Sequence, residues 1–395
     1  MKKTLRNMML VAAALTTTMV FTGCKDDDDN NKASNGNSTE VEYKAMAEQY
    51  VNNTVIYTYK QLAEKTEQLA ADLETLKDSK TQANLNKVCA TFLDAREWWE
   101  KSEAFLFGAA TSFGIDPHID SWPLDATRFD ALMSNANQLE QLDGDDGDIV
   151  ANGLEATLLG FHGLEYVLFA NGAAKQVSAI TDNQLIYAVA VAGDLRNCCY
   201  RLAVSWAGED NVPARYVEKM EEAEWEYTVN GNGRSYGEDM LRAGNAGSTY
   251  ESFAHVMQQI ATGCADIADE VGTSKVGSAY KGEDETYIES PYSKKSLIDF
   301  RDNMISIQNA YMGGVEGQRN ESKSIHNYVK AHNATLDSEI MTAISNAINE
   351  FETKAAEGAF VDTYMNAGAY DKAMQYCAEV EEAMLKLRVF FGGEE

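Results

Sequence analysis

Apolar residues recur three and four positions apart along most of the 395-residue chain, and runs that alternate apolar and polar residues are scarce. Such spacing gathers apolar side chains on one face of a helix, so the pattern predicts an all-α fold. Asp148, Thr181 and Ser290 are residue types that begin helices, while Gly108 and Gly272 are types that end them. The predicted helices cover residues 41–77, 82–108, 125–141, 148–170, 182–207, 213–228, 248–271, 293–312, 321–331, 334–355 and 362–389.

The segment of residues 154–169 is apolar around nearly the whole circumference of a helix, which is typical of a buried helix. It nevertheless contains His162 and Glu165, which lie three residues apart and therefore on one face. A buried carboxylate is costly unless it is paired, protonated or bound to a metal. Gly160 and Gly163 flank the histidine, and each costs roughly 1 kcal/mol relative to alanine inside a helix. We therefore expect another backbone or a ligand to approach closely here.

The spacing of His162 and Glu165 is compatible with three roles. An imidazole nitrogen and a carboxylate oxygen one helical turn apart can bind one metal ion. The same pair can also be a buried hydrogen-bonded contact without a ligand. Zinc peptidases usually need more, such as an H-E-x-x-H motif with a third ligand and a general base, and the chain has no H-E-x-x-H sequence. From spacing alone, metal binding, a structural pair and peptidase catalysis all stay open.

An internal repeat is visible at an offset of 205 residues. Residues 92–97 (FLDARE) align without gaps with residues 297–302 (LIDFRD), and the same offset pairs Gly108 with Gly313. The repeat predicts two related helical bundles, with chance similarity between two amphipathic helices as the alternative. We place the N-terminal bundle at residues 41–178 and the C-terminal bundle at residues 179–392. The second copy has no counterpart of the His-Glu pair, so we expect a single site.

The N-terminus reads as a targeting segment. Three basic residues precede a short apolar run, and Cys24 follows small residues, as in bacterial lipoproteins. This resemblance implies a signal peptide of residues 1–23, lipidation of the Cys24 thiol, and anchoring to a membrane. Residues 24–40 are acidic and polar and are expected to form a flexible tether. A lysine followed by acids after the lipidated cysteine resembles a surface-export signal, so we expect an outer-membrane lipoprotein at the cell surface, with a periplasm-facing location as the alternative.

Charge and cysteine content narrow the possible partners of the protein and the possible roles of its cysteines. The formal net charge of −29 argues against nucleic acid as a partner. The cysteines after position 24 are odd in number and lack C-x-x-C spacing, so they are expected to be buried thiols rather than disulfides or a metal site. These cysteines are Cys89, Cys198, Cys199, Cys264 and Cys377.

Two loops and the remaining histidines are expected to have ordinary structural roles. Residues 143–148 are acidic, but Leu154 stands where a calcium-binding EF-hand loop needs its glutamate, so an acidic connection is expected. Residues 229–247 are predicted to be a long Gly-rich connection. The remaining histidines have no paired spacing and are expected to be surface or hydrogen-bonded side chains. They are His118, His255, His326 and His332.

Two further segments carry candidate polar residues. Arg96, Trp99, Glu100 and Glu103 recur on one helix face, as in a surface ladder of ion pairs. Residues 119–125 (IDSWPLD) form a proline-containing turn whose last acid could cap a helix. Periodicity alone gives neither segment a role beyond these structural ones.

The chain resembles the imelysin-like family, which is named after an insulin-cleaving membrane protease. Residues 160–165 (GFHGLE) resemble the family's G-x-H-x-x-E motif, and residues 122–125 (WPLD) resemble its W-P-L-D turn. Residues 290–293 (SPYS) resemble its second-half segment, where this chain departs by continuing with two lysines. The remaining residues that carry the resemblance are Arg96, Trp99, Ser102, Glu103, Phe107, Gly108, Asn309, Tyr311 and Gly313.

The resemblance implies an all-helical fold of two related bundles with a site near their junction. It places His162 and Glu165 at the centre as metal ligands. The family is classed with metallopeptidases, yet its members are associated with iron acquisition, so the resemblance implies iron or zinc as the metal, with uptake-system proteins as partners and proteolysis as the alternative activity. A surface interaction protein with a structural His-Glu pair is a second alternative. Candidate neighbours of the site are Arg96, Trp99, Glu103, Trp122, Asp125, Gly160, Gly163, Asn309 and Tyr311.

Overall fold

The computed structural model describes residues 30–394, with side chains described from residue 38 onward. The chain is all-α, as predicted. Its described strands, β1 (Phe169–Ala170) and β2 (Ala173–Ala174), are two residues long each and pair with each other in antiparallel orientation. The helices are α1 (Asn30–Tyr50), η1 (Val51–Ile56), α2 (Tyr57–Asp78), α3 (Gln82–Glu100), η2 (Glu103–Phe105), α4 (Ala109–Ser112), α5 (Ile115–Ile119), α6 (Ala126–Met133), α7 (Ala136–Leu142), α8 (Asp148–Gly153), η3 (Ala156–Leu158), α9 (Gly160–Leu168), η4 (Val177–Ala179), α10 (Asp182–Ala207), η5 (Glu209–Asn211), α11 (Ala214–Glu222), η6 (Val229–Gly231), α12 (Tyr236–Leu241), α13 (Phe253–Glu270), η7 (Val271–Lys275), α14 (Gly277–Tyr280), α15 (Ser296–Met312), η8 (Glu321–Lys323), α16 (Ile325–His332), α17 (Ala334–Glu357), α18 (Phe360–Thr363) and α19 (Asp371–Phe390).

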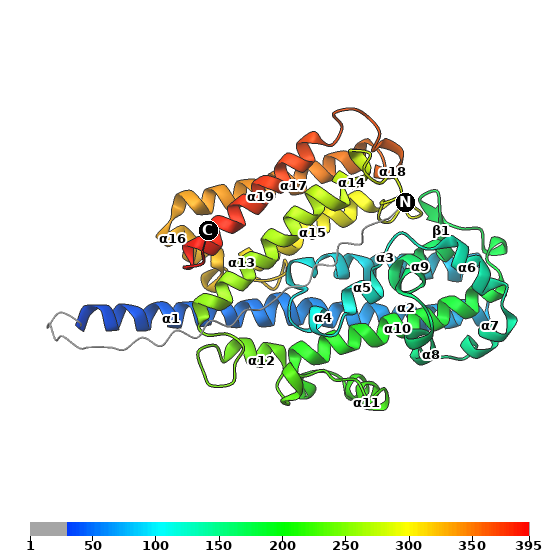
Figure 1. Ribbon diagram of the computed structural model, residues 1–395, viewed down its shortest axis with the longest axis horizontal. Coiled ribbons are helices and arrows are strands. Elements are labelled where there is room, and N and C mark those ends of the chain that lie inside the picture. The colour runs from blue at the N-terminus through cyan, green and yellow to red at the C-terminus, as the bar shows by residue number, and fades with distance from the viewer. Residues whose placement is uncertain (1–29, 395) are drawn as a thin grey trace, which may run out of the picture. The chain divides into compact units, whose positions relative to one another are not determined.

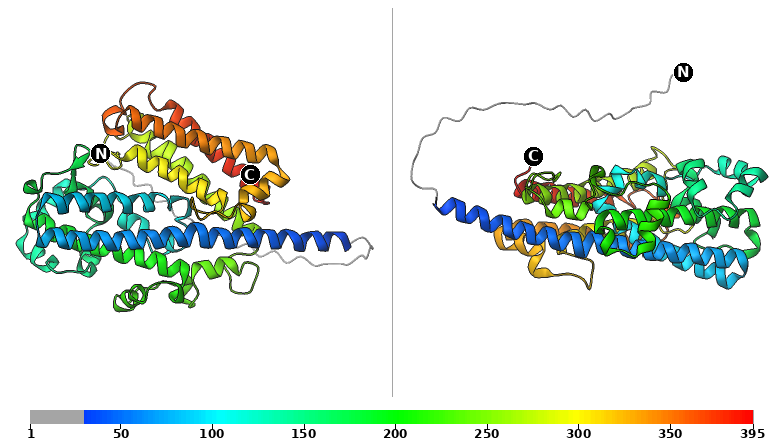
Figure 2. Two further views of the ribbon diagram at one scale, coloured as in Figure 1. Left: turned by 180° about the vertical axis from the view of Figure 1, so that it is seen from behind. Right: turned by 90° about the horizontal axis from the view of Figure 1, so that it is seen from below.

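The first bundle is built around α2, against which α3 and α10 both pack (Figure 1). Figure 2 shows α2 and α3 side by side from behind. The start of α10 is fixed by a capping box, in which Thr181 accepts from the Gln184 backbone while the Gln184 side chain accepts from the Thr181 backbone. The predicted start at Thr181 is therefore confirmed. Most of α10 is buried because it contacts α2, α9 and several of the short helices.

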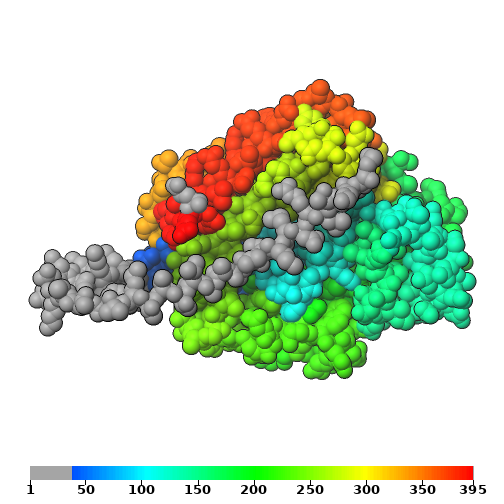
Figure 3. Space-filling model, viewed as in Figure 1, coloured from blue at the N-terminus to red at the C-terminus, as the bar shows by residue number. Residues whose placement is uncertain are grey.

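The second bundle consists of α13, α15, α17 and α19, which run side by side in Figure 1. In Figure 3 the surface of α19 lies next to that of α13. The predicted helix end at Gly272 is wrong, because α13 continues without a break into the π-helical segment η7. That continuation carries Lys275 into the interior, where it is 1% exposed.

The expected boundary at residue 179 does not separate the two bundles. α10 lies on the C-terminal side of that boundary, yet it packs against α2 and α9 of the first bundle. The periodic pattern showed a helix at 182–207 but not which bundle buries its apolar face. Residues 40–394 form one compact unit, and α1 begins at Asn30, inside the segment expected to be a tether.

Several predicted helices are shorter than the pattern suggested. The predicted helix of residues 148–170 is interrupted between α8 and α9, where Leu154, Glu155 and Leu159 are extended. The helix predicted for 82–108 ends at Glu100, and the one predicted for 125–141 divides into α6 and α7. The break before α9 lies where the chain passes close to the Ile119 backbone and the Tyr187 hydroxyl, which an apolar pattern does not reveal.

The repeated segments lie on α3 and α15, which pack against each other across the junction of the bundles. Asn303 donates to the Glu100 carboxylate over 2.6 Å, and the Ala104 backbone N–H donates to Ser306 over 3.1 Å. Gly108 and Gly313, paired by the repeat, both have positive φ angles of 75° and 78°. α3 and α15 therefore bring polar residues of both bundles to one interface.

The predicted signal peptide, Cys24 and the first part of the tether lie outside the described residues. Within residues 30–394 no helix combines the length and apolar character that a bilayer crossing requires. The five described cysteines are buried and free, as predicted.

Candidate functional site

The helix that carries the G-x-H-x-x-E motif begins at Gly160. Gly160 has a φ of 61°, and a Cβ atom there would overlap the backbone carbonyl of Ile119. Gly163 leaves room for the Tyr187 hydroxyl, which donates to the Leu158 carbonyl over 2.6 Å. Both glycines thus allow close approach, as predicted, and Gly160 lets the chain turn into α9 directly against the end of α5.

His162 lies between two carboxylates. Its Nε2 atom is 3.0 Å from Oδ1 of Asp120, which directly follows α5, and its Nδ1 atom is 3.7 Å from Oε2 of Glu165. The other Glu165 oxygen accepts backbone N–H groups from Tyr292 and Ser293, over 3.0 and 2.7 Å. The loop after Glu289 therefore fixes Glu165, while Oε2 of Glu165 has no hydrogen-bond partner among the described residues.

Arg96 is the central cation of the cluster. It is 2% exposed and donates to the carboxylates of Asp120 and Glu289. It also lies 2.5 Å from Glu100 and 3.8 Å from Asp299 on α15. The predicted surface ladder on this face is therefore wrong, because the docking of α15 and the loop before it covers the face completely.

Two aromatic side chains line the polar cluster. Trp99 Nε1 donates to Asp120 Oδ2 over 2.7 Å, so Asp120 is held by α3 as well as by its own backbone position. The Trp122 ring lies 5.6 Å from the His162 ring and 5.3 Å from the ammonium group of Lys275. Trp122 thus lies near both the imidazole and this second buried cation.

Lys275 lies near Trp122 and among three carboxyl groups. Its Nζ atom is 3.3 Å from Glu289 and 3.9 Å from both Glu100 and Glu103. A π-helical turn places it there, and such turns often occur at functional sites.

The buried cluster contains more carboxyl groups than cations. The cations are Arg96, His162 and Lys275, and the carboxyl groups are those of Glu100, Glu103, Asp120, Glu165, Glu289 and Asp299.

In this cluster, the pKa values of several carboxyl groups are shifted upward. Burial raises the pKa of Glu100 to about 8 and that of Asp299 to about 7, against the attraction of Arg96. Burial also raises the pKa of Glu103 and Glu289, although Lys275 opposes the shift. The site therefore holds protons near neutral pH that a bound cation could replace.

The pKa values of Asp120 and His162 shift in the directions that favour an ion pair between them. Burial opposes ionisation of Asp120, but Arg96 and His162 outweigh it and hold the pKa of this carboxyl well below its usual range. Burial likewise opposes protonation of His162, but Asp120 and Glu165 outweigh it and raise the pKa of the imidazole to about 9. Without a ligand, the pair is accordingly an imidazolium beside a carboxylate.

Trp122 lines two cavities. One, of about 280 Å³, is bounded by His162, Glu165, Ile288 and Tyr292. The other, of about 240 Å³, is acidic and is bounded by Glu103, Asp116, Asp120, Glu270 and Lys275, among others. The first cavity gives the His-Glu pair space for a ligand.

The structure brings some predicted neighbours to the site and leaves others elsewhere. Trp122 lies beside His162, Arg96 and Trp99 contact Asp120, and Glu103 belongs to the wider cluster through Lys275. Asp125 instead caps α6 by accepting from the Arg128 backbone over 3.0 Å, as its structural interpretation predicted.

Asn309 and Tyr311 lie farther along α15. Asn309 accepts from Thr54 and Arg319, and Tyr311 donates to Asp337 over 2.8 Å. At 1.5 Å per residue, ten residues separate Asn309 from Asp299 by about 15 Å along the helix. These two residues support the end of α15 rather than the site.

Sequence reasoning missed four residues of the cluster and misjudged Glu100. Asp120 stands in the same IDSWPLD turn as Trp122, and Glu289 directly precedes the SPYS segment, so both were next to recognised motifs. Asp299 belongs to the repeat that was recognised. Lys275 gave no local signal, because only the π-helical continuation of α13 carries it inward.

Comparisons with known proteins show which proteins this chain is similar to. The family model described as imelysin, peptidase family M75, matches residues 55–384. The chain is 28% identical over 264 residues to iron-regulated protein A of Synechococcus elongatus, an alignment that spans 67% of this chain and 63% of that relative.

Two solved structures share the fold. A crystal structure of a protein assigned as an iron-regulated protein A precursor from Parabacteroides distasonis has a TM-score of 0.74 at 25% identity, covering 89% of this chain and 95% of that one. An imelysin-like protein from Psychrobacter arcticum has a TM-score of 0.59 at 13% identity, covering 89% and 93%, which supports the fold alone. Because the family model covers most of the chain and the G-x-H-x-x-E segment forms the buried centre of the site, the protein belongs to the imelysin family.

Proposed function

We propose that this protein captures iron, as the ion or as iron held by a small oxygen-donor ligand, in the cavity beside His162 and Glu165, and delivers it for uptake at the cell envelope. The observation that carries the proposal is the geometry of this pair. His162 Nδ1 and Glu165 Oε2 lie 3.7 Å apart beside a cavity of about 280 Å³. That separation suits two ligand atoms that share one metal ion about 2.1 Å from each.

The remaining atoms of the pair are already held by the protein. Asp120 lies at Nε2 of His162, and backbone N–H groups engage the other oxygen of Glu165. A carboxylate on the far nitrogen of a metal-binding histidine orients the ring and strengthens it as a ligand. His162 and Glu165 would therefore bind the metal, whereas Asp120, supported by Trp99, would position His162.

The inner face of the cluster is a poorer metal site. Asp120, His162 and Glu289 offer ligand atoms within 4.8 Å of one another. The guanidinium group of Arg96, however, already donates to both carboxylates of that group. A metal there would have to displace a buried cation, so the cavity side of His162 is favoured.

The donor set favours iron over the usual zinc chemistry. One imidazole nitrogen and one carboxylate oxygen leave several coordination positions to water or to the oxygen atoms of a carried ligand, for which the cavity has space. Nitrogen and oxygen donors of this kind suit iron, whereas structural and catalytic zinc sites usually have three or four protein ligands.

The relatives add support from outside the site. The Synechococcus relative and the Parabacteroides protein both bear names that describe iron-regulated proteins. This chain spans 63% of the length of the first, so the transfer of an iron-related role is part of the proposal. The sequence before residue 25 supports a lipid-anchored location at the outer membrane, where an uptake system would be the partner.

Calorimetric titration of the metal-free full chain with iron(II), iron(III) citrate and zinc(II) tests the proposal. We expect one iron-binding site per chain, with affinity lowered at least tenfold in Glu165→Gln and lost in His162→Ala. His326→Ala is the matched control, because His326 pairs with Asp337 over 2.6 Å and lies outside the site cluster. The control should bind iron as the unaltered chain does.

Three outcomes would overturn the proposal. Absence of binding by the folded chain would leave His162 and Glu165 as a structural pair. Tighter binding of zinc than of both forms of iron would assign a different metal. Cleavage of a test peptide by the metal-loaded chain, abolished by a chelator and by Glu165→Gln, would make the site that of a metallopeptidase.

A further inference from the structure

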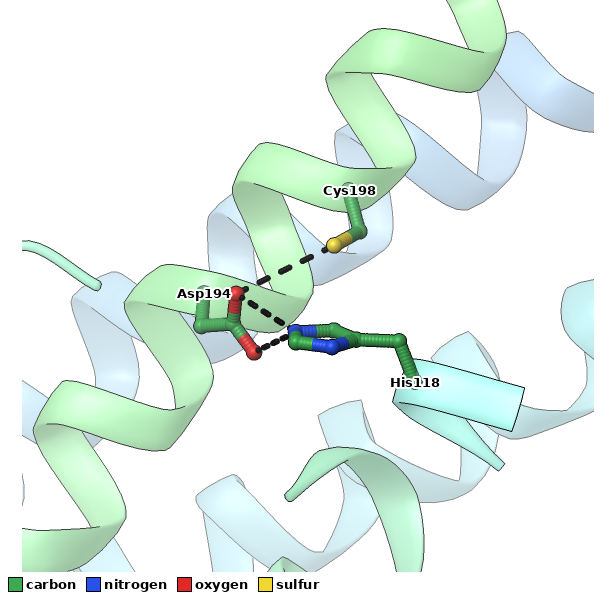
Figure 4. Close-up of side chains that lie close together, drawn as sticks. All are labelled: His118, Asp194 and Cys198. Atoms are coloured by element: carbon green, nitrogen blue, oxygen red, sulfur yellow. Dashed lines mark hydrogen bonds and ion pairs between the residues drawn. The ribbon is translucent and has the colours of Figure 1, made fainter. Parts of the chain in front are cut away.

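A second group of metal-ligating side chains lies outside the interbundle site. His118 on α5 faces Asp194 and Cys198 on α10, as Figure 4 shows. His118 Nε2 is 2.9 and 3.1 Å from the two Asp194 oxygens, and Cys198 Sγ is 3.9 Å from Asp194 Oδ1. A nitrogen, an oxygen and a sulfur donor all lie within 4.8 Å of one another.

The local structure supports a built site rather than a chance contact. Asp194 and Cys198 are four residues apart and therefore project from the same face of α10. Asp194 is 0% exposed, and within residues 38–394 it forms its ion pair with His118. A fully buried carboxylate whose near neighbours are an imidazole and a thiol is a position that can accept a cation.

Access to this group comes through the histidine. The His118 side chain is 26% exposed, whereas the acid and the thiol are buried. A small outward rotation of the imidazole would widen the present hydrogen-bonding distance to the separation that two ligands of one metal require. Solvent at the His118 side could then supply a fourth ligand.

We infer that His118, Asp194 and Cys198 form a second metal site, selective for zinc(II) or another borderline divalent cation. A mixed nitrogen, oxygen and sulfur donor set with an open fourth position matches tetrahedral zinc better than iron. Binding releases the thiol proton of Cys198 to solvent, and the thiolate then bonds to the metal. This inference does not depend on the iron proposal, because neither His162 nor Glu165 belongs to the group of His118, Asp194 and Cys198.

The second site also lies close in sequence to a residue of the first site. α5 carries His118 and is followed at once by Asp120, which contacts His162. A metal at His118 would join α5 to α10 and restrict the helix that positions Asp120. We therefore expect zinc to raise the Tm of the chain through this site.

Cobalt(II) is the probe of choice, because a cobalt–thiolate bond absorbs in the near ultraviolet and tetrahedral cobalt absorbs in the visible. The full chain carrying Cys24→Ser, reduced and metal-free, is titrated with cobalt and then with zinc. We expect one equivalent of cobalt to produce both bands and one equivalent of zinc to remove them. Cys198→Ser should abolish the thiolate band, and His118→Gln should weaken binding at least tenfold.

Two controls distinguish metal binding at Cys198 from binding at a neighbouring thiol or at the iron site. Cys199→Ser alters the next buried cysteine on the same helix and should leave the cobalt spectrum and the zinc-induced rise in Tm unchanged. His162→Ala should abolish iron binding and leave the cobalt–thiolate band in place, so the two proposals fail separately. A missing thiolate band in the folded chain, or a band that survives Cys198→Ser, would overturn the inference and leave an ordinary His-Asp hydrogen bond.

Discussion

Replacing Lys275 with methionine would remove one buried positive charge while keeping most of the side-chain volume. The ammonium group lies 3.3 Å from Glu289 and 3.9 Å from Glu100 and Glu103. Each contact corresponds to about 4 kcal/mol at an effective dielectric constant of 20. The cost of burying the ion and proton uptake by the acids offset much of this attraction, so we expect Lys275→Met to lower the free energy of unfolding by about 3–5 kcal/mol.

The same substitution should strengthen cation binding. Lys275 lies 5.3 Å from the Trp122 ring, which in turn lies 5.6 Å from the His162 ring. The ammonium is therefore within about 11 Å of the imidazole, and its repulsion of a divalent cation there is about 3 kcal/mol at the same dielectric constant. Even half of that value corresponds to roughly a tenfold gain in affinity.

Urea denaturation and iron titration of the same preparation would measure the two effects. The matched control is Lys219→Met, because Lys219 also contacts two carboxylates, Asp146 and Asp148, over 3.2 and 3.1 Å. Those carboxylates are about half exposed, so this control should change stability by about 1 kcal/mol or less and leave affinity unchanged. Unchanged or weaker iron binding by folded Lys275→Met would refute the view that Lys275 is a counter-ion competing with the metal.

Further predictions concern the pH dependence of stability, two glycine substitutions and the loss of a helix cap. In metal-free protein, burial raises the pKa values of Glu100 and Asp299 to about 8 and about 7. The folded state thus holds protons that the unfolded state releases, so chemical denaturation should show stability falling as pH rises from about 4.5 to about 8. Gly160→Ala should lower Tm strongly by overlap with Ile119, whereas Gly153→Ala, which meets no atom within 4 Å, should leave Tm unchanged or raise it. Asp125→Ala should cost about 1 kcal/mol in urea denaturation through its lost helix cap, without changing iron affinity.

Periodicity predicted the long helices well because each buries one continuous face. The predicted bounds of α10, residues 182–207, coincide with those observed, since a capping residue starts it and Gly208 ends it. The pattern failed at α9, where an apolar run contains an extended break that only the approach of Ile119 and Tyr187 explains. Sequence signals identify helix ends that are set by capping residues, and they miss helix ends that are set by contacts with other elements.

The site was foreseen in part for a related reason. His162 and Glu165 were found because a polar pair in an apolar segment is costly and therefore informative. Arg96 and Glu100 gave the opposite impression, since charges spaced along a helix are ordinary on a surface. Only the packing of α15 against α3 converts that exposed-looking face into the interior. Burial by another element is a property of the fold, which spacing within one helix cannot report.

The energetics of the cluster argue that it is retained for a task other than stability. Each buried ion carries a desolvation cost of several kcal/mol, and replacement of buried ion pairs by well-packed apolar side chains is often neutral or stabilising. Here three buried cations face six buried carboxyl groups, and the excess is met by protons at raised pKa. An apolar junction between α3 and α15 would avoid that cost entirely. Under the proposed function, a cation bound beside His162 and Glu165 would lower these pKa values by its charge and so release protons from the cluster.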